Sequence, residues 1–262
     1  LAEAPAFQAH PTGAWPPFVP NGARWADART LMLGLQRLRP ETRYGFFLAG
    51  HEIAFTTAGE DTVLTVPPPP AAGPRQLVVP DQFASVQAAV DAARPGDTVV
   101  VRPGTYRELV RLKDGVSLTG TDRDRCILEG VDDARSVIEA VGCRTGGLVA
   151  NLTVDGRHPD DPAKGPDGIR IEESRLAVRN CLLRNCDGGI WPRAALDAAL
   201  EGNTARNCKI GIGFTHGARG TATGNTCEDC RQTGLDISDP GTEVAARNNT
   251  CLRNGVRGIE AR

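Results

Sequence analysis

A single stretch of helical spacing is followed by many short apolar runs that end in glycine, asparagine or other polar residues. In the segment 83–104, Val86, Ala89, Val90 and Ala93 recur at i, i+3, i+4 and i+7, which predicts an amphipathic helix. The helix should end at Pro95 and Gly96, and the valines at 99–101 then begin a series of short strands. A helix in this place can cover the open end of a stacked β-structure and stop further strands from adding there.

Four later segments are versions of one unit. They span 180–191, 203–214, 225–237 and 249–261. Their alignment places Ile190, Ile212, Leu235 and Ile259 in one column, and Ile169 fits an earlier coil. A glycine precedes each of these residues. The members of that glycine column are Gly168, Gly189, Gly211, Gly234 and Gly258. A leucine-rich repeat would need its LxxLxLxxN signature, which is absent, so the short strands separated by Asn and Gly predict a β-solenoid.

Each column has an expected physical role. The aliphatic column should point inward, because side chains alternate between the faces of a strand. The glycine column indicates a positive φ or a crowded turn before each strand. Asn203, Asn225 and Asn249 should form a hydrogen-bonded ladder at the turns, where asparagine also tolerates the left-handed conformation. The region 98–262 has room for roughly seven coils. No polar capping element follows Ile259, so we expect this end to continue or to lie against a partner.

The segment GDTVVVRPGTYRE at 96–108 resembles the opening of the right-handed parallel β-helix proteins, the pectin-lyase-like superfamily. The resemblance covers residues 76–262 and implies an all-β solenoid, a right-handed parallel β-helix with an N-terminal cap helix. It implies no particular catalytic residue. The NTD, DD, GHG and RIK motifs of polygalacturonases, the GxVDFIFG motif of pectin methylesterases and the DPHE motif of alginate epimerases are all absent.

Residues 1–75 do not follow the repeat, so we expect a small N-terminal α+β or irregular module there and the β-helix in 76–262. The pattern predicts a helix around 25–38 and strands at 44–56 and 62–66. Pro67 to Pro70 then form a stiff, extended linker.

Charge and hydropathy argue against two classes of protein, those that bind nucleic acid and those that span a membrane. A net charge of −2 provides no basis for binding nucleic acid, and no apolar run is long enough to span a membrane. Of the eight cysteines, Cys186, Cys208 and Cys230 recur at the repeat period, which predicts a column of buried free thiols. Cys227 and Cys230 have zinc-ligand spacing but lack a second half-site, so no metal site is assigned to them.

The register also predicts one outward face. If the aliphatic column faces inward, the next residue on each coil faces out. These residues are Arg170, Trp191, Gly213, Asp236 and Glu260. A second outward set follows two residues later, with His216 beside it. Its members are Glu172, Arg193, Thr215, Ser238 and Arg262. The charged loop 155–170, which contains His158 and Asp167, should enter at the edge of this face.

An aromatic ring among charged groups suits a sugar polymer, because the ring stacks on sugar faces while the polar groups hold hydroxyls or uronates. The candidate substrate-binding residues are Trp191, Arg170, Arg193, His216, His158 and Asp167. Asp236 and Glu260 lie on adjacent coils and are the candidate catalytic pair of a glycoside hydrolase or polysaccharide lyase. The same two carboxylates could instead hold Ca²⁺ or point into water; no other cofactor is expected.

Two functions stay open. One is a polysaccharide- or oligosaccharide-binding or -processing protein, for which a periplasmic or secreted location is favoured. The alternative is a non-catalytic structural or adhesive scaffold for a protein partner.

Overall fold

The computed structural model describes residues 23–25, 31–33, 43–48, 51–56, 73–131, 134–157 and 165–262. The chain divides into two compact units, Leu1–Gly73 and Pro74–Arg262.

Two antiparallel strand pairs lie among the described residues of the first unit. β1 (Ala23–Trp25) pairs with β2 (Leu31–Leu33), and β3 (Arg43–Leu48) pairs with β4 (His51–Thr56). The strand prediction over 44–56 is therefore confirmed. The helix prediction over 25–38 is wrong at Leu31–Leu33, which form a strand. A short apolar run fits a strand as well as a helix, and here its pairing with β1 stabilises the strand. The predicted strand at 62–66 and the proline linker lie outside the described residues.

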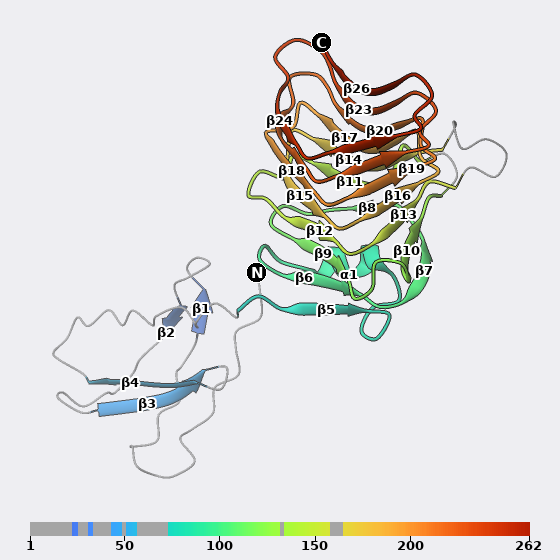
Figure 1. The fold of residues 1–262 in the computed structure, drawn as a ribbon. Coiled ribbons are helices and arrows are strands. Elements are labelled where there is room, and N and C mark those ends of the chain that lie inside the picture. Colours follow the sequence, from blue (N-terminus) through green and yellow to red (C-terminus); the bar gives the residue numbers. More distant parts are fainter. Residues whose placement is uncertain are drawn as a thin grey trace. The chain divides into compact units, whose positions relative to one another are not determined.

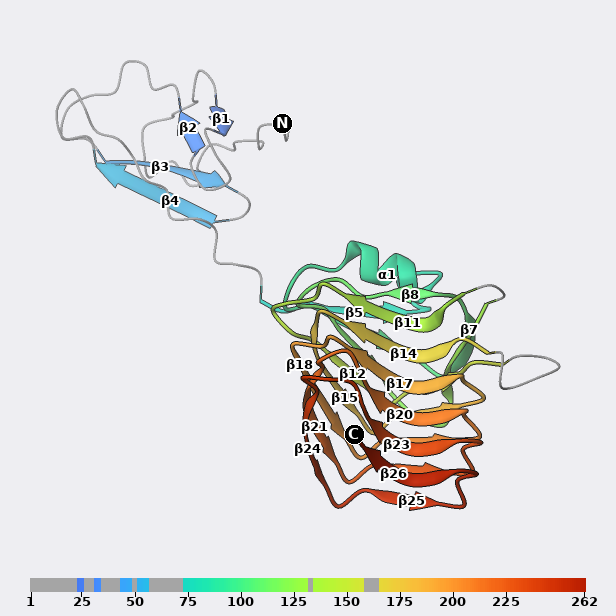
Figure 2. The ribbon, with the colours of Figure 1, turned by 90° about the horizontal axis from the view of Figure 1, so that it is seen from above.

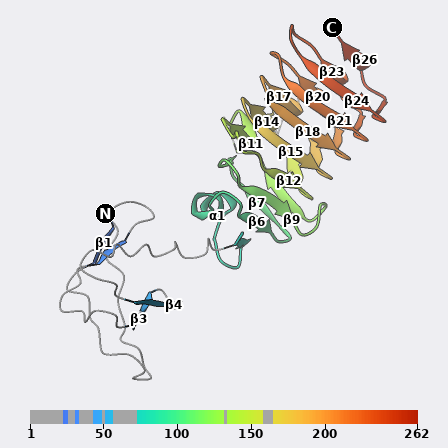
Figure 3. The ribbon, with the colours of Figure 1, turned by 90° about the vertical axis from the view of Figure 1, so that its left-hand side faces the viewer.

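The second unit is a parallel β-helix of about eight turns built from three sheets (Figures 1 and 3). The first sheet contains β5 (Gln76–Val79), β6 (Thr98–Val101), β9 (Ser117–Gly120), β12 (Leu148–Ala150), β15 (Arg175–Arg179), β18 (Asp197–Glu201), β21 (Arg219–Thr223) and β24 (Glu243–Arg247). The second sheet contains β7 (Gly104–Arg107), β10 (Cys126–Glu129), β13 (Thr153–Asp155), β16 (Leu182–Arg184), β19 (Thr204–Arg206), β22 (Thr226–Glu228) and β25 (Thr250–Leu252). The third sheet contains β8 (Val110–Arg111), β11 (Ser136–Val141), β14 (Asp167–Glu172), β17 (Gly188–Arg193), β20 (Ile210–Phe214), β23 (Thr233–Ile237) and β26 (Arg257–Ala261). The predicted fold class is confirmed.

The cap helix α1 (Val86–Ala92) lies at one end of the stack (Figure 2). Its buried side chains include those of Val86 and Val90. Ser85 caps it by accepting a hydrogen bond from Ala88 N at 3.1 Å, and the Glu108 carboxylate accepts two more from the first turn. One feature was not predicted. β5 precedes the helix and pairs in parallel with β6, so the solenoid begins one strand earlier than the sequence pattern indicated.

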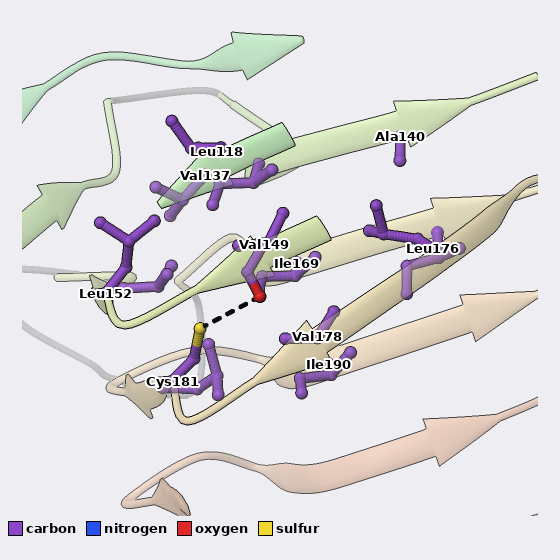
Figure 4. Packing of buried hydrophobic residues seen from close by; sticks show 14 of the residues in the cluster. Leu118, Val137, Ala140, Val149, Leu152, Ile169, Leu176, Val178, Cys181 and Ile190 are labelled. Carbon is purple, nitrogen blue, oxygen red and sulfur yellow. Dashed lines mark hydrogen bonds between the residues drawn. The ribbon is translucent and has the colours of Figure 1, made fainter. Parts of the chain in front are cut away.

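Apolar side chains stack inside the coils in columns that the backbone register aligns (Figure 4). Ile169 and Ile190, for example, are register partners and fully buried. Ile259 occupies the same column but is 54% exposed, because it lies on β26 at the edge of the third sheet. Cys186, Cys208 and Cys230 are buried and form no disulfide, as predicted. Burial raises the pKa of the Cys230 thiol to about 12, so it stays protonated and packs as an apolar group.

The glycine column is required by crowding between coils. A Cβ atom on Gly189 would lie 2.4 Å from the Gly211 carbonyl oxygen, and one on Gly211 would lie 2.5 Å from that of Gly234. Neither glycine has a positive φ, so crowding, and not the backbone conformation, explains why glycine is found at these positions. From Gly168 to Gly234, successive coils approach at this column too closely to admit a side chain.

The asparagine ladder is present as predicted. Asn203 Nδ2 donates to Asn225 Oδ1, and Asn225 Nδ2 donates to Asn249 Oδ1, each at 3.0 Å. The left-handed conformation falls one residue earlier than expected, on Gly202, Gly224 and Asn248. The ladder asparagines are instead selected for their side-chain amides, which satisfy buried backbone groups from one coil to the next.

Candidate functional site

The third sheet carries the predicted candidates Asp167, Arg170, Trp191, Arg193, Asp236 and Glu260, and its strands lie side by side in the order of the coils (Figure 2). The register pairs Arg170 with Trp191, Gly213 with Asp236, and Asp236 with Glu260. The second outward row is also correct, since Glu172 pairs with Arg193 and Arg193 bridges to Thr215. The face that was predicted from the repeat spacing therefore exists.

The Trp191 indole packs against two glycines of this face, Gly188 and Gly213. A Cβ atom on Gly188 would lie 2.4 Å from indole Cε3, and one on Gly213 would lie 2.7 Å from Cζ3. The absence of side chains at these two positions makes room for the six-membered ring. The residue is half-buried. Part of the ring is thus covered by the glycine positions while part remains accessible, as a residue that stacks on a ligand requires.

Most arginines described on this face already have a carboxylate partner. Arg170 donates twice to Glu172 Oε2, at 2.7 Å from Nη2 and 3.0 Å from Nε. Arg111 lies 3.3 Å from Glu139. These pairs neutralise one another, so Arg170 is a weaker candidate for holding a ligand than the sequence suggested. The Arg170 guanidinium also lowers the pKa of the Glu172 carboxyl.

Arg193 is held differently. Its Nη2 lies 3.1 Å from His216 Nε2, and His216 Nδ1 lies 3.1 Å from Asp239 Oδ2. Asp239 Oδ2 also accepts a hydrogen bond from the His216 backbone N–H at 3.0 Å. Sequence reasoning missed Asp239. Its separation of 23 residues from His216, one repeat step, is the signal that would have found it.

Three buried polar atoms of the third sheet have no hydrogen-bond partner among the described residues. They are Arg193 Nε, Thr215 Oγ1 and Asp236 Oδ1. They come from β17, from the residue after β20 and from β23, which are consecutive strands of this sheet. Arg193 Nε is a donor, the Thr215 hydroxyl can donate or accept, and the Asp236 carboxylate oxygen is an acceptor. A buried polar group without a partner is costly, so these three atoms destabilise this face unless a partner reaches them.

The predicted catalytic pair is on adjacent strands, but its two members differ. Two arginines hold the Glu260 carboxylate, Arg257 at 2.8 Å and Arg262. Asp236 has no such partner, and burial raises the pKa of its carboxyl, with the negative charge of Glu260 acting in the same direction. Asp236 therefore suits proton transfer better than Glu260.

Asp167 is the other carboxylate of interest. It begins β14, where the charged loop ends, and its side chain is 15% exposed. Its Oδ1 accepts a hydrogen bond from Gly188 N at 3.1 Å, and its Oδ2 is 4.0 Å from Arg170. Burial raises the pKa of the Asp167 carboxyl to about 6, against the opposing effect of the Gly188 hydrogen bond. A Cβ atom on Gly188 would lie 2.4 Å from Trp191 Cε3 and 3.1 Å from Asp167 Oδ1. The indole and the Asp167 carboxylate are therefore neighbours.

We expect Asp167 to make folding stability depend on pH. Its folded pKa of about 6 exceeds the value of about 3.9 usual for an unfolded chain, so the folded state binds the proton more tightly. The contribution is full below about pH 4 and falls by about 2 kcal/mol as the pH rises through 6. Asp167→Asn keeps the acceptor oxygen and should remove this change, which denaturant unfolding of both proteins at pH 4 and 8 measures. Equal pH dependence in the two proteins would contradict the assignment.

His158 lies outside the described residues. Across the described parts of the chain, no group of three or more His, Cys, Asp or Glu residues is placed to hold a metal ion. No helix among these residues has the length and apolar character needed to cross a membrane.

The sequence was compared with models of known protein families and with curated proteins. Residues 140–262 match the family model described as "Right handed beta helix region". The matched residues lie within the second unit, whose fold is a right-handed parallel β-helix, as the sequence predicted. No curated protein matches the chain in sequence.

Three solved structures illustrate the similarity. The A-module of a mannuronan C-5 epimerase from Azotobacter vinelandii is 18% identical, with a TM-score of 0.41, over 68% of this chain and 69% of that one. A pectin methylesterase from carrot is 14% identical, with a TM-score of 0.47, over 70% and 64%. The catalytic domain of a GH87 α-1,3-glucanase is 15% identical, with a TM-score of 0.43, over 82% and 46%. The chain thus spans less than half of the glucanase domain.

Proposed function

We propose that the protein binds or processes a polysaccharide on the outer face of the third sheet. The observation that supports this best is the half-buried Trp191 indole against Gly188 and Gly213, on the same sheet as three unpartnered buried polar atoms. An aromatic platform next to fixed donors and an acceptor matches the two surfaces of a sugar ring, apolar on its faces and hydroxylated at its edge. A protein with this function would act where polysaccharides are found, so we propose a periplasmic or secreted location.

If the protein is an enzyme, Asp236 and Asp167 are its candidate proton-transfer groups, because both carboxyls have raised pKa values on the proposed binding face. Either a lyase or a glycoside hydrolase would need such groups. Ca²⁺ between Asp236 and Glu260 fits poorly, since two guanidinium groups already hold Glu260.

The second candidate function is a scaffold for a protein partner. The charge pairs that cover much of this face are typical of a solvated protein surface, and they keep this alternative open.

Trp191→Ala should weaken binding to the preferred oligosaccharide at least about tenfold, because the stacking surface is lost. Trp191→Phe keeps an aromatic ring and should retain part of the affinity. We expect Trp191→Ala to lower the melting temperature only slightly, since the ring is half-buried outside the core. The measurement is an oligosaccharide array followed by calorimetric titration and thermal unfolding of all three proteins.

Three results of this experiment separate the functions. Turnover that disappears in Asp236→Asn while binding persists identifies an enzyme. Binding without turnover identifies a lectin-like protein. A protein that binds no glycan on the array, yet captures a protein partner through this face, establishes the scaffold and ends the carbohydrate proposal.

A further inference from the structure

We propose that the stacked thiols of Cys227 and Cys251 form a binding site for one soft monovalent metal ion, Cu(I), held between the two sulfurs. The residues lie on β22 and β25 of the second sheet, and Cys227 is 1% exposed because it faces the interior of the coils. The site is therefore separate from the outer face of the third sheet, and the inference goes beyond the proposed function without depending on it.

The backbone places the two sulfurs one above the other. Cys227 and Cys251 are register partners on neighbouring parallel strands. A Cβ atom on Gly211 would lie 2.8 Å from Cys227 Sγ, and one on Gly234 would lie 2.9 Å from Cys251 Sγ. Gly211 and Gly234 are consecutive members of the glycine column, so both thiols point into equivalent spaces that the missing side chains leave open, one coil apart.

The two sulfurs also face each other. The Cys227 thiol donates a hydrogen bond to the Cys251 sulfur, and this bond, together with one from the Leu235 backbone N–H, lowers the pKa of the Cys251 thiol to about 7 against the opposing effect of burial. Hydrogen-bond donors thus already surround the sulfur that most readily becomes a thiolate. The thiolate is the form of cysteine that binds metal ions.

The spacing of the pair suits a metal ion better than a disulfide. Register partners on parallel strands hold their Cβ atoms at about the strand spacing, about 4.8 Å, whereas a disulfide needs a Cβ–Cβ distance of about 3.8 Å. Bonds between thiolates and metal ions are about 2.3 Å long, so two opposed bonds span about 4.6 Å. An ion between the sulfurs therefore requires little movement of the strands.

Cu(I) is the ion that fits such a pair, because it is soft, prefers thiolate ligands and is satisfied by two of them in a line. Zn²⁺ would need four ligands, and no group of three or more His, Cys, Asp or Glu residues within the described ranges is placed to supply them. On binding, each thiol loses its proton and forms one Cu–S bond. Copper keeps its oxidation state, and the two released protons pass to water.

An ion can reach the pair from the side of Cys251. This residue is half-buried, whereas the seven other cysteines are buried. It lies on β25, the outermost described strand of the second sheet, where local opening is easiest. Cys186 and Cys208 are also joined by a thiol hydrogen bond, but both are fully buried. Binding is therefore expected at the Cys227–Cys251 pair alone.

The test is titration of the fully reduced protein with Cu(I), kept monovalent by ascorbate under nitrogen, in competition with a colorimetric Cu(I) chelator. We expect one tightly bound equivalent, and X-ray absorption of the loaded protein should show a copper ion with two sulfur neighbours. Cys251→Ala should lower the affinity at least about 100-fold, because even a partner outside the ligand shell is worth about 10- to 100-fold.

Cys227→Ala should have the same effect. Ala205 occupies the preceding step of the same column, which shows that an alanine fits there. Cys143→Ala removes a buried thiol far along the chain and is the matched control; it should keep the tight equivalent. Cys230→Ala should keep it as well, since Cys230 shares the CxxC spacing with Cys227 but is not its register partner. If Cys227→Ala does not fold, Cys251→Ala on the outermost strand provides the test.

Three outcomes overturn the inference. Undiminished affinity in Cys251→Ala shows that the ion binds elsewhere. Loss of the tight equivalent in Cys230→Ala, with Cys251→Ala unchanged, assigns the ion to the CxxC pair instead. A protein that takes up no Cu(I) in competition with the chelator has no such site. None of these results bears on polysaccharide binding, which Trp191→Ala tests separately.

Discussion

Gly211→Ala should lower the free energy of unfolding by about 3 kcal/mol, the upper end of the usual cost of overpacking. The new Cβ atom would lie 2.5 Å from the Gly234 carbonyl oxygen and 2.8 Å from Cys227 Sγ. Neither neighbour can move freely, because the carbonyl belongs to the next coil and the thiol is buried in the core. The coils must separate locally, which breaks ladder hydrogen bonds or loosens the core.

Gly258→Ala is the matched control for this prediction. Gly258 belongs to the same column, but a Cβ atom there would meet only Cys251 Cβ at an ordinary 3.4 Å. We expect its unfolding free energy to change by less than about 0.5 kcal/mol. Thermal and denaturant unfolding measure both variants. Equal stability of the two variants would show that crowding between coils does not explain the glycine column.

Asn225→Leu should also cost about 3 kcal/mol, because several buried polar groups lose their partners together. Asn225 Oδ1 accepts from the backbone N and from Nδ2 of Asn203, each at 3.0 Å, while Asn225 Nδ2 donates to Leu200 O at 3.0 Å. Asn225 is 1% exposed, so water cannot replace these bonds without opening the turn. Leucine has similar volume and supplies none of them.

Thr226→Val is the control for the asparagine ladder. Thr226 is the next residue, faces outward from β22 and is half-buried, so we expect a change within about 0.5 kcal/mol. Asn203→Leu should behave like Asn225→Leu, since it occupies the preceding step of the ladder. If both asparagine variants unfold at the denaturant concentration of the unchanged protein, the ladder does not stabilise the fold.

The proposed binding face shows how far the repeat pattern reaches. Spacings of 22 and 23 residues aligned Ile190, Ile212 and Leu235, and from that column the outward positions of Trp191 and Asp236 followed. Register is readable from sequence because one step along a strand moves every side chain to the other face, which would place the apolar column in water. The repeat spacing alone was therefore enough to assign the candidate residues to one sheet.

The hydrogen-bond and ion-pair partners of each candidate residue could not be predicted from the strand register. Arg170 and Arg193 are both outward arginines in the repeat, yet Arg170 has a carboxylate partner and Arg193 does not. Glu260 and Asp236 are likewise equivalent by position, but only Glu260 is held by arginines. Side-chain torsions choose among several neighbours within reach, and spacing does not record that choice.

The sequence by itself determined the parallel β-helix, its repeat, its buried thiols and asparagine ladder, and the face that carries Trp191, because all of these follow from periodic burial of apolar side chains. Only the tertiary structure decided that β5 precedes the cap helix, that Leu31–Leu33 form a strand, and that Asp239 and His216 hold Arg193. These features depend on pairing between segments and on the directions of individual side chains, which the order of residues along the chain does not record.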